Sequence, residues 1–416
     1  MIIDTISETI MTKEELQILP IQLIEQHPRI ILQWATGTGK SKAAIDTANY
    51  LIERNGHLRV LLVVAEINHK SNWEREFKKW KLKECDITME CYASLRKYKN
   101  SSWDLIIFDE GHHLGSDLRM NLLTEIFSRY IIVLSATLPD QVIYSLNQIF
   151  GDFKISKVTL GEAIKGGLLP KPRIYLIPLI LDNTHQEYSV TEEWGNKGKE
   201  KTIRKCSFYE RWKFLKHKEQ YPDTSLVISC TAKQKYDYLT NKCEYWKSRY
   251  LTSRVEFMKT KWLQCGLQRK RFLGDLKTIV AANLLNRIKD KRLICFCSSI
   301  DQARILGGRN AVHSEENKSL QIIEKFNRKE ISSLFAVGLL QEGQNLVDIQ
   351  AGVIIQLDGK ERAFVQKFGR SLRAEDPIQF ILYYENTRDE EYLKKALDGI
   401  DETYIIKVER LEDLEI

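Results

Sequence analysis

The sequence predicts an α/β protein with two parallel sheets and a separate, mainly helical insert between them. Two blocks of the chain, residues 30–137 and 293–384, alternate short apolar runs with helix-length polar segments. Such alternation is typical of parallel sheets that are covered by helices on both faces. The segment between the blocks differs because it is rich in basic and aromatic residues. A chain of 416 residues also exceeds the size of one typical domain.

The apolar runs of the two blocks give the expected strands. They are residues 30–32, 60–64, 105–108 and 131–134 in the first block, and 293–297, 334–337, 353–357 and 380–384 in the second. Glycines and prolines between residues 161 and 172 indicate a hinge after the first block. We therefore expect three units, at residues 1–180, 181–280 and 281–416.

The positive charge of the chain is concentrated in the expected insert. Residues 191–280 contain 15 Lys and 6 Arg against 10 Asp or Glu, a net charge of +11, whereas the whole chain has +7. Half of the eight tryptophans lie in the same stretch: Trp194, Trp212, Trp246 and Trp262. Basic residues interleaved with aromatics suit a surface that pairs with phosphates and stacks on bases. The alternative is a helical bundle with an aromatic core and a solvated lysine face.

Composition and cysteine usage indicate a cytoplasmic protein. Hydrophobic residues make up 43% and charged residues 29% of the chain, as in ordinary globular proteins. No uncharged apolar run approaches about 18 residues, and the first charges, Asp4 and Glu8, have the wrong sign for a secretory signal. The eight cysteines form no C-x-x-C pair and none has a histidine at metal-binding spacing. We expect free thiols, no membrane association and a monomer.

A glycine-rich loop follows the first apolar run. Residues 34–41 read W-A-T-G-T-G-K-S and precede a helix-like segment. A phosphate chain can lie on the backbone N–H groups of such a loop, with Lys40 reaching the β/γ-phosphates and the Ser41 hydroxyl holding Mg²⁺. The general pattern has glycine where this chain has Trp34, and a turn that only caps a helix is the alternative.

An acidic pair, Asp109 and Glu110, follows the apolar run 105–108 directly. The carboxyl end of a buried strand in a parallel sheet faces the crevice where ligands bind. There Asp109 can hold Mg²⁺, and Glu110 can orient the attacking water and accept its proton. The separation from Lys40 is typical of Walker A and Walker B segments, so the two together indicate a nucleotide site. His112 would link that site to the next motif.

Four segments in order resemble motifs of the DExH-type superfamily 2 helicases. Residues 35–41, 109–112, 135–137 and 366–373 resemble motifs I, II, III and VI. Residues 63–68, 92–95, 294–300 and 337–348 resemble the intermediate motifs Ia, Ib, IV and V. The chain particularly resembles compact phage-encoded helicases of DNA repair and branch migration. If it is phage-encoded, its location would be the cytoplasm of the bacterial host.

This resemblance implies two RecA-like domains with ATP and Mg²⁺ in the cleft between them. Arg370 and Arg373 would reach across from the second domain as arginine fingers, with Gln366 beside them, and would stabilise the charge of the transition state. Gln22 is our candidate for reading adenine. The expected nucleotide-binding residues are Thr36, Gly37, Thr38, Gly39, Lys40, Ser41, Gln22 and Gly343.

The resemblance also implies a nucleic-acid track on the opposite side of the cleft. Hydroxyls, amides and backbone groups at strand ends would hold phosphates without reading sequence. The candidates are Asn68, His69, Lys70, Ser94, Ser298, Ser299 and Asn345. The form of motifs Ia and VI favours DNA over RNA. The expected activity is an ATP-dependent DNA helicase or duplex translocase; an RNA helicase and a non-processive ATP switch or annealing factor are the alternatives.

Overall fold

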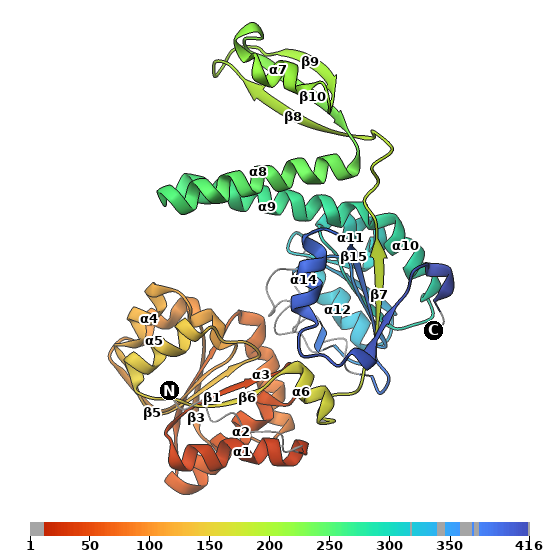
Figure 1. Cartoon of the computed structure of the whole chain (residues 1–416). Helices are drawn as coiled ribbons and strands as arrows, with labels where there is room; N and C mark the ends of the chain where they lie inside the picture. The colour runs from red at the N-terminus through yellow and green to blue at the C-terminus, as the bar shows by residue number, and fades with distance from the viewer. Residues whose placement is uncertain (1–11, 317, 339–345, 358–367, 370–373, 415–416) are drawn as a thin grey trace.

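The computed structural model describes residues 12–316, 318–338, 346–357, 368–369 and 374–414 of the chain. Figure 1 shows two α/β units and an insert that projects from the second of them. Each unit contains a parallel sheet with helices around it, so the predicted fold class is confirmed.

The first unit is built on a six-stranded sheet of order β3-β2-β4-β5-β1-β6, in which every neighbouring pair is parallel. Its strands are β1 (Arg29–Trp34), β2 (Arg59–Val64), β3 (Asp86–Cys91), β4 (Ser101–Phe108), β5 (Ile126–Ser135) and β6 (Lys154–Val158). Its helices are α1 (Lys13–Gln26), α2 (Lys40–Asn55), α3 (Ile67–Lys79), α4 (Asp117–Leu123), α5 (Asp140–Phe150) and α6 (Leu160–Lys165), with 3₁₀ turns η1 (Tyr92–Tyr98) and η2 (Gly111–Leu114).

The central strands of this sheet are apolar on both faces. Ile30 and Leu32 of β1 point into one hydrophobic cluster with α1 and α2, whereas Ile31 lies in a second cluster with α5. Successive side chains of a strand alternate between faces, so a continuous apolar run is buried only when helices cover both. The carboxyl ends of β1 and β4 therefore meet at one edge of the sheet, where the glycine loop and the acidic pair follow them.

The second unit is built on a seven-stranded parallel sheet of order β12-β13-β11-β14-β15-β7-β16. Its strands are β7 (Arg173–Leu179), β11 (Leu293–Phe296), β12 (Ala311–Val312), β13 (Ser333–Ala336), β14 (Ala351–Ile354), β15 (Ile378–Tyr384) and β16 (Ile405–Lys407). Its helices are α10 (Thr278–Arg287), α11 (Ile300–Gly307), α12 (Ser319–Asn327) and α14 (Arg388–Ala396), with 3₁₀ turns η4 (Gly308–Asn310), η5 (Glu402–Tyr404) and η6 (Leu411–Asp413).

The strand β7 corrects the expected boundary at residue 180. It pairs with β15 from Arg173 against Ile378 to Leu179 against Tyr384, and with β16 on its other side. Its apolar residues join the core of the second sheet on both faces. The first unit thus ends before β7, and the insert interrupts the second unit between β7 and β11.

The insert contains a sheet in addition to the expected helices. Strands β8 (Tyr188–Trp194), β9 (Thr202–Ser207) and β10 (Thr224–Cys230) form a three-stranded sheet of order β8-β10-β9, with the short α7 (Arg211–Lys216) and the 3₁₀ turn η3 (Lys218–Gln220) between β9 and β10. Burial alternates along β10, where Leu226 and Ile228 face a small core with Phe214 of α7. The insert is still mainly helical, as expected, and this alternation, which is the period of a half-buried strand, adds a small sheet to it.

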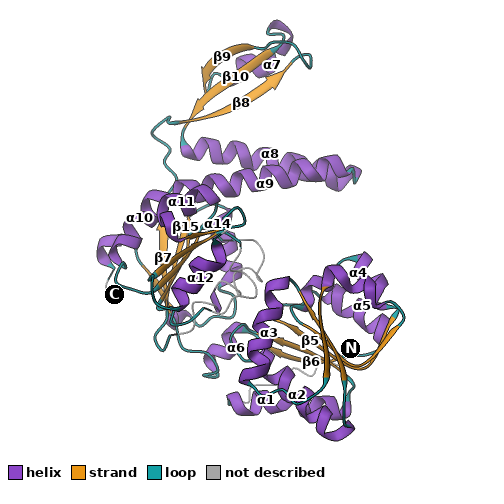
Figure 2. Cartoon of the chain, turned by 180° about the vertical axis from the view of Figure 1, so that it is seen from behind, coloured by secondary structure: helices purple, strands orange, loops and turns teal. Residues whose placement is uncertain are grey.

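Two long helices, α8 (Ala232–Ser253) and α9 (Glu256–Leu276), form the rest of the insert. Figures 1 and 2 show them as an antiparallel hairpin that lies between the three-stranded sheet and the two α/β units. Tyr250 stacks on Trp262 between the helices, with ring centroids 6.0 Å apart. An aromatic core is therefore present in part of the insert, whereas other rings, such as Trp212, are exposed.

A buried ion pair fixes the insert to the second unit. The Lys277 ammonium, between α9 and α10, lies 2.5 Å from the carboxylate of Asp389 on α14, and both side chains are almost fully buried. The ammonium also donates to the backbone oxygen of Ile355 at 2.8 Å. Burial lowers the pKa of Lys277, and the attraction of Asp389 opposes that shift. Close by, a Cβ on Gly274 would lie 2.3 Å from the Cβ of Ser298, so α9 approaches the end of β11 very closely.

The two α/β units contact each other directly. Gly161, at the start of α6, faces Gly399, and a Cβ on Gly161 would lie 1.8 Å from the oxygen of Gly399. A single hydrophobic cluster includes Ala35 and Leu169 from the first unit and Phe368 from the second. The loop after β1 is therefore packed against the second unit.

Candidate active site

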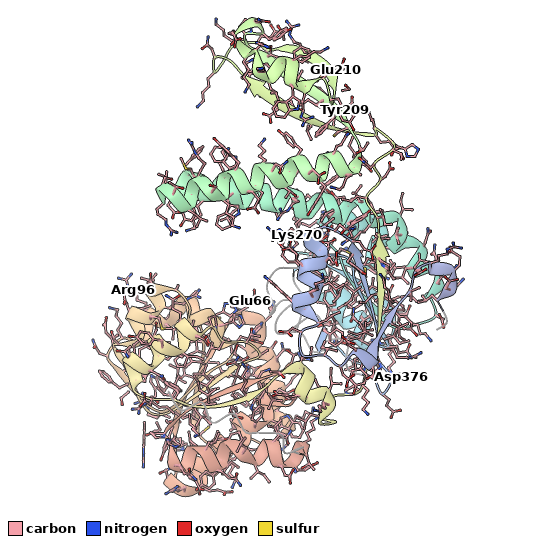
Figure 3. All side chains as sticks on the ribbon, viewed as in Figure 1. Glu66, Arg96, Tyr209, Glu210, Lys270 and Asp376 are labelled. Carbon is pink, nitrogen blue, oxygen red and sulfur yellow. The ribbon has the colours of Figure 1, made fainter. Side chains whose placement is uncertain are left out.

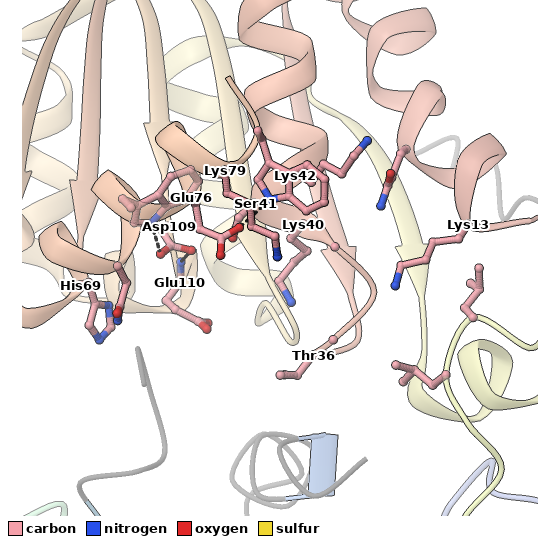
Figure 4. A pocket seen from close by; sticks show the side chains of 18 of the residues that line it. Lys13, Thr36, Lys40, Ser41, Lys42, His69, Glu76, Lys79, Asp109 and Glu110 are labelled. Atoms are coloured by element: carbon pink, nitrogen blue, oxygen red, sulfur yellow. Dashed lines mark hydrogen bonds between the residues drawn. The ribbon is translucent and has the colours of Figure 1, made fainter. Parts of the chain in front are cut away.

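A cavity of about 720 Å³ lies at the carboxyl ends of β1 and β4. Figure 4 shows the side chains that point into it, among them Lys40, Ser41, Asp109 and Glu110. The structure thus brings the glycine loop and the acidic pair together, although about 70 residues separate them in the chain.

The glycine loop has the backbone shape of a phosphate cradle. Gly37 and Gly39 have φ angles of 94° and 97°, which L-residues with side chains rarely adopt. Gly39 is the N-cap of α2, so the free N–H groups of this helix face the cavity. The Lys40 ammonium donates to the backbone oxygen of Trp34 at 2.9 Å and lines the same cavity. An anion at the helix N-terminus would find both charge and backbone donors.

Trp34, which replaces the usual glycine, belongs to the core. Its side chain is fully buried, and its indole N–H donates to the hydroxyl of Ser156 on β6 at 2.8 Å. Trp34 is the last residue of β1, and its side chain packs in the hydrophobic cluster between the sheet and α2. The sequence alone gave no account of this packing.

Asp109 is held in a buried position by two donors. Its carboxylate accepts from the indole N–H of Trp73 at 2.8 Å and from the backbone N–H of Glu110 at 3.1 Å. Burial, helped by the charge of Glu110, raises the pKa of Asp109 to about 6, against the opposing effects of Trp73 and Lys40. A nearby cation would stabilise the ionised form of a carboxylate that is buried in this way.

The residues present suit Mg²⁺ with a nucleotide. Ser41 and Asp109 line one cavity, and proteins commonly bind Mg²⁺ through one or two carboxylates together with substrate phosphates. Within the described part of the chain, no cluster of three or more His, Cys, Asp or Glu side chains is placed to hold a metal by itself. The donor set is therefore one that the phosphates of a nucleotide would complete.

Glu110 is connected to the loop after β5 through His112. Glu110 adopts a left-handed conformation with φ of 50°, and its carboxylate lies 3.3 Å from Nδ1 of His112. The same nitrogen is 3.5 Å from the hydroxyl of Ser135, which donates to the backbone oxygen of Thr137 at 2.7 Å. This short relay joins the segments that resemble motifs II and III.

The structure brings Gln17 to the cavity and leaves Gln22 outside it. Gln22 is exposed on α1, whereas Gln17 lines the cavity with Lys13. A Cβ on Gly39 would lie 2.7 Å from the Gln17 amide nitrogen, so this side chain rests on the glycine loop. Lys13 and Gln17 are four residues apart and share one helix face, a spacing that the sequence does contain.

Two of the residues expected to contact nucleic acid in the first unit, His69 and Lys70, make contacts within that unit. His69 is buried and lines the cavity next to Trp73. The Lys70 ammonium lies 3.1 Å from Glu90, which also binds Lys97. Asn68 and Ser94 are half-buried. The structure thus places His69 on the nucleotide side of the unit.

In the second unit, Ser298 and Ser299 shape the start of α11. The Ser299 hydroxyl accepts from the backbone N–H of Gln302 at 3.2 Å and donates to Asp275 of α9 at 3.4 Å. The Ser298 hydroxyl donates to the Gln302 side chain at 3.0 Å. Both serines therefore have local structural roles, and they connect this motif to the end of the insert.

Five expected residues lie outside the described part of the chain: Gly343, Asn345, Gln366, Arg370 and Arg373. The described residues that flank the last two are close to the nucleotide loop. A Cβ on Gly369 would lie 2.8 Å from the Cβ of Thr36, and Ala374 and Glu375 line the cavity. The cavity is consequently shared by both α/β units.

Two segments of the chain match known protein families. Residues 2–100 match the type III restriction enzyme res subunit, and residues 275–375 match the helicase conserved C-terminal domain. With the fold, these matches support a superfamily 2 helicase and indicate an enzyme that hydrolyses ATP. Among the described residues, no helix has the length and apolar character needed to cross a membrane.

Individual relatives are distant. A provisionally named ATP-dependent RNA helicase of Methanocaldococcus jannaschii, MJ1505, is 26% identical over 132 residues, which are 28% of this chain and 17% of that protein. The solved structure of S. cerevisiae Dbp5 bound to RNA and ADP BeF3 is similar, with a TM-score of 0.54 and 11% identity over 95% of this chain and 89% of that one.

A DNA-bound structure is equally similar in fold. The ATP-dependent type ISP restriction-modification enzyme LlaBIII bound to DNA gives a TM-score of 0.53 and 11% identity, covering 97% of this chain and 32% of that one. The chain thus spans less than a third of LlaBIII. Likenesses at this identity establish the fold of two RecA-like domains.

Proposed function

We propose that the protein is an ATP-dependent DNA helicase or duplex translocase of the DExH type. The observation that carries the proposal is the shared cavity. Lys40, Ser41 and the acidic pair line it from the first unit, and Ala374 and Glu375 line it from the second. Since ATP in such a place contacts both units, its binding and hydrolysis would change how the units sit on each other.

The residues of the cavity have separate roles in this proposal. Lys40 and the N-terminus of α2 bind the phosphate chain, and Ser41 with Asp109 would hold Mg²⁺, which supplies charge neutralisation at the β- and γ-phosphates when bound. Glu110 orients the attacking water and accepts its proton. His112 contacts both this carboxylate and the Ser135 hydroxyl and so holds Glu110 in position.

The arginine-finger role of Arg370 and Arg373, with Gln366 beside them, extends the proposal to residues outside the described part. Support comes from the neighbours of this segment. Gly369 abuts Thr36, and Glu375 lines the cavity. A guanidinium delivered from there would reach phosphoryl oxygens, an arrangement that contributes about 10³- to 10⁵-fold in related phosphoryl transfers.

The choice of DNA rests on the form of motifs Ia and VI, while the relatives include proteins of both kinds. LlaBIII is described as bound to DNA, and Dbp5 as bound to RNA. An RNA helicase is therefore the second candidate. We further propose that the protein is a monomer and that it acts in the cytoplasm; the eight free cysteines support the proposed location.

ATP hydrolysis should be measured with single-stranded DNA, duplex DNA, forked DNA and RNA of matched length, followed by strand displacement on the best activator. We expect forked or duplex DNA to stimulate turnover most. Stimulation by RNA alone would establish the second candidate, and stimulation without displacement would favour the ATP switch.

The catalytic assignment is tested by Glu110→Gln, which should abolish turnover and retain ATP binding. Glu84→Gln is the matched control, because Glu84 is an exposed carboxylate of the same unit. Normal turnover in Glu110→Gln would refute the role of Glu110 as the general base.

A further inference from the structure

The segment around α7, at the outer end of the insert, presents aromatic rings to solvent. Tyr209 is 75% exposed and Trp212 is 61% exposed, which is unusual for large aromatic side chains. Figure 3 shows Tyr209 on the three-stranded sheet module, beyond the helical hairpin. We call Phe208, Tyr209, Arg211 and Trp212 the α7 platform.

The rings of the α7 platform are held in place by their neighbours. The Arg211 guanidinium lies 3.6 Å from the ring centroid of Phe208 and 4.9 Å from that of Trp212. The turn before α7 is closed by Glu210, whose carboxylate accepts from the Ser207 hydroxyl at 2.8 Å. The Tyr209 ring centroid lies 6.4 Å from that of Phe208. Both exposed rings therefore have a neighbour that restricts them, which lowers the entropic cost of ordering them on a planar ligand.

The surroundings of the α7 platform are strongly basic. Residues 203–218 contain six Lys or Arg and one Glu. Three of the lysines, at 205, 213 and 216, are exposed, and none has a carboxylate within 4 Å among the residues that the structure describes. Elsewhere in the insert, Lys201 and Lys233 are paired with Glu193 and Asp237. The charge around the α7 platform is thus available to an external anion.

We propose that the α7 platform is an accessory binding site for single-stranded nucleic acid, which stacks unpaired bases on Tyr209 and Trp212 and pairs its phosphates with Lys205 and Lys213. Exposed rings, with exposed lysines a few residues away in the same segment, fit a ligand that has both planar bases and phosphates. Bases inside a duplex are already stacked on each other and do not offer their faces. The inference rests on the proposed function, because it assumes a nucleic-acid substrate, and it adds a site outside the ATP cavity.

The position of the α7 platform determines which quantity it should affect. Figures 1 and 2 place the three-stranded sheet on the far side of the α8–α9 hairpin from both α/β units. No residue of the platform lines the ATP cavity. The α7 platform should therefore change the affinity for nucleic acid and leave the turnover number at saturation unchanged.

The test is a comparison of Tyr209→Ala/Trp212→Ala with the unchanged protein. Binding of fluorescent oligo-dT and oligo-U is followed by anisotropy without nucleotide, and ATPase stimulation is titrated with the same strands. Stacking on one aromatic contributes about 1–3 kcal/mol, so we expect binding to weaken by about 5- to 150-fold for each base that loses its partner. The two strands distinguish DNA from RNA as the source of the bases.

Three further variants separate stacking from folding and from charge. Tyr209→Phe/Trp212→Phe keeps the rings and should bind as the unchanged protein does. Tyr144→Ala is the matched control, since Tyr144 is a 63% exposed ring on α5 of the first unit. Lys205→Gln/Lys213→Gln should reduce the salt dependence of single-strand binding by about 0.7 log units per lost phosphate contact.

The proposal is overturned if the alanine variant binds both oligo-dT and oligo-U with the same affinity as the unchanged protein. If the unchanged protein binds single strands through the α7 platform but shows no stimulated ATPase, the proposed function fails while this site stands. If ATPase stimulation is intact and the alanine variant has the same half-maximal concentration, only this site fails.

Discussion

Replacing Lys277 by methionine tests the buried ion pair that anchors the insert. The Asp389 carboxylate would lose its partner at 2.5 Å while remaining buried. Its donors among the described residues would then be the Gln356 amide at 2.7 Å and the Tyr384 backbone N–H at 3.4 Å. Removing one partner of a buried pair costs about 3–5 kcal/mol. For a unit of this size we expect the unfolding temperature to fall by about 6–20 °C.

The control for this prediction is Lys233→Met, which breaks an exposed pair with Asp237 on α8. Such pairs contribute about 0.3–0.5 kcal/mol. The double change Lys277→Met/Asp389→Asn removes the uncompensated charge and should recover most of the stability. Calorimetric or fluorescence-detected unfolding of the full chain measures all three. If Lys277→Met loses no more stability than Lys233→Met, the pair is not buried in the folded protein as described.

Three shorter predictions address the first unit and its contact with the second. Burial alone would raise the pKa of Glu90, but the Cys91 backbone N–H and two ammonium groups outweigh it and lower the pKa from 4.5 to about 2. Because the pKa of Glu90 is depressed in the folded protein, Glu90→Gln should destabilise the protein by up to about 3 kcal/mol at pH 7. This loss of stability should shrink as the pH falls from 4.5 toward 2. Urea unfolding at pH 7 and pH 3 measures the loss, and an equal loss at both pH values would contradict the prediction. Gln17→Ala should raise the KM for ATP by about fivefold through loss of one hydrogen bond, while Gln22→Ala leaves it unchanged; the reverse order in ATPase titrations would restore Gln22 as the candidate. Gly369→Ala should lower kcat by about tenfold or more without changing the unfolding temperature, because its Cβ would press on Thr36 across the two units; Gly266→Ala is the control, and equal kcat values for both would rule out close approach at this point.

The features predicted correctly from the sequence are those determined by local pattern. Continuous apolar runs specified the buried strands, and the G-T-G-K-S order specified a turn that needs positive φ at Gly37 and Gly39. The meeting of that loop with Asp109 followed from a general property of parallel sheets. These inferences need no knowledge of which strand pairs with which.

The features that were missed depend on pairing between distant segments. The apolar run in β7 gives no sign that its neighbours are β15 and β16, which come about 200 residues later. The alternation of β10 is present in the sequence, but the three-stranded sheet also depends on the pairing of β10 with β8 and β9. The interior location of His69 on α3 and the contact of Ser299 with Asp275 of α9 depend on tertiary packing.

The interruption of the second unit by the insert makes the insert a lever arm. Because α8 has 22 residues, it extends about 33 Å at 1.5 Å per residue. The base of the α8–α9 hairpin is fixed to the second unit by Lys277 and by the close approach of Gly274. Each degree of rotation of the second unit would therefore move the far end of the hairpin by about 0.6 Å. A rotation of about 6° would then carry that end through about 3.4 Å, the rise of one nucleotide along a strand.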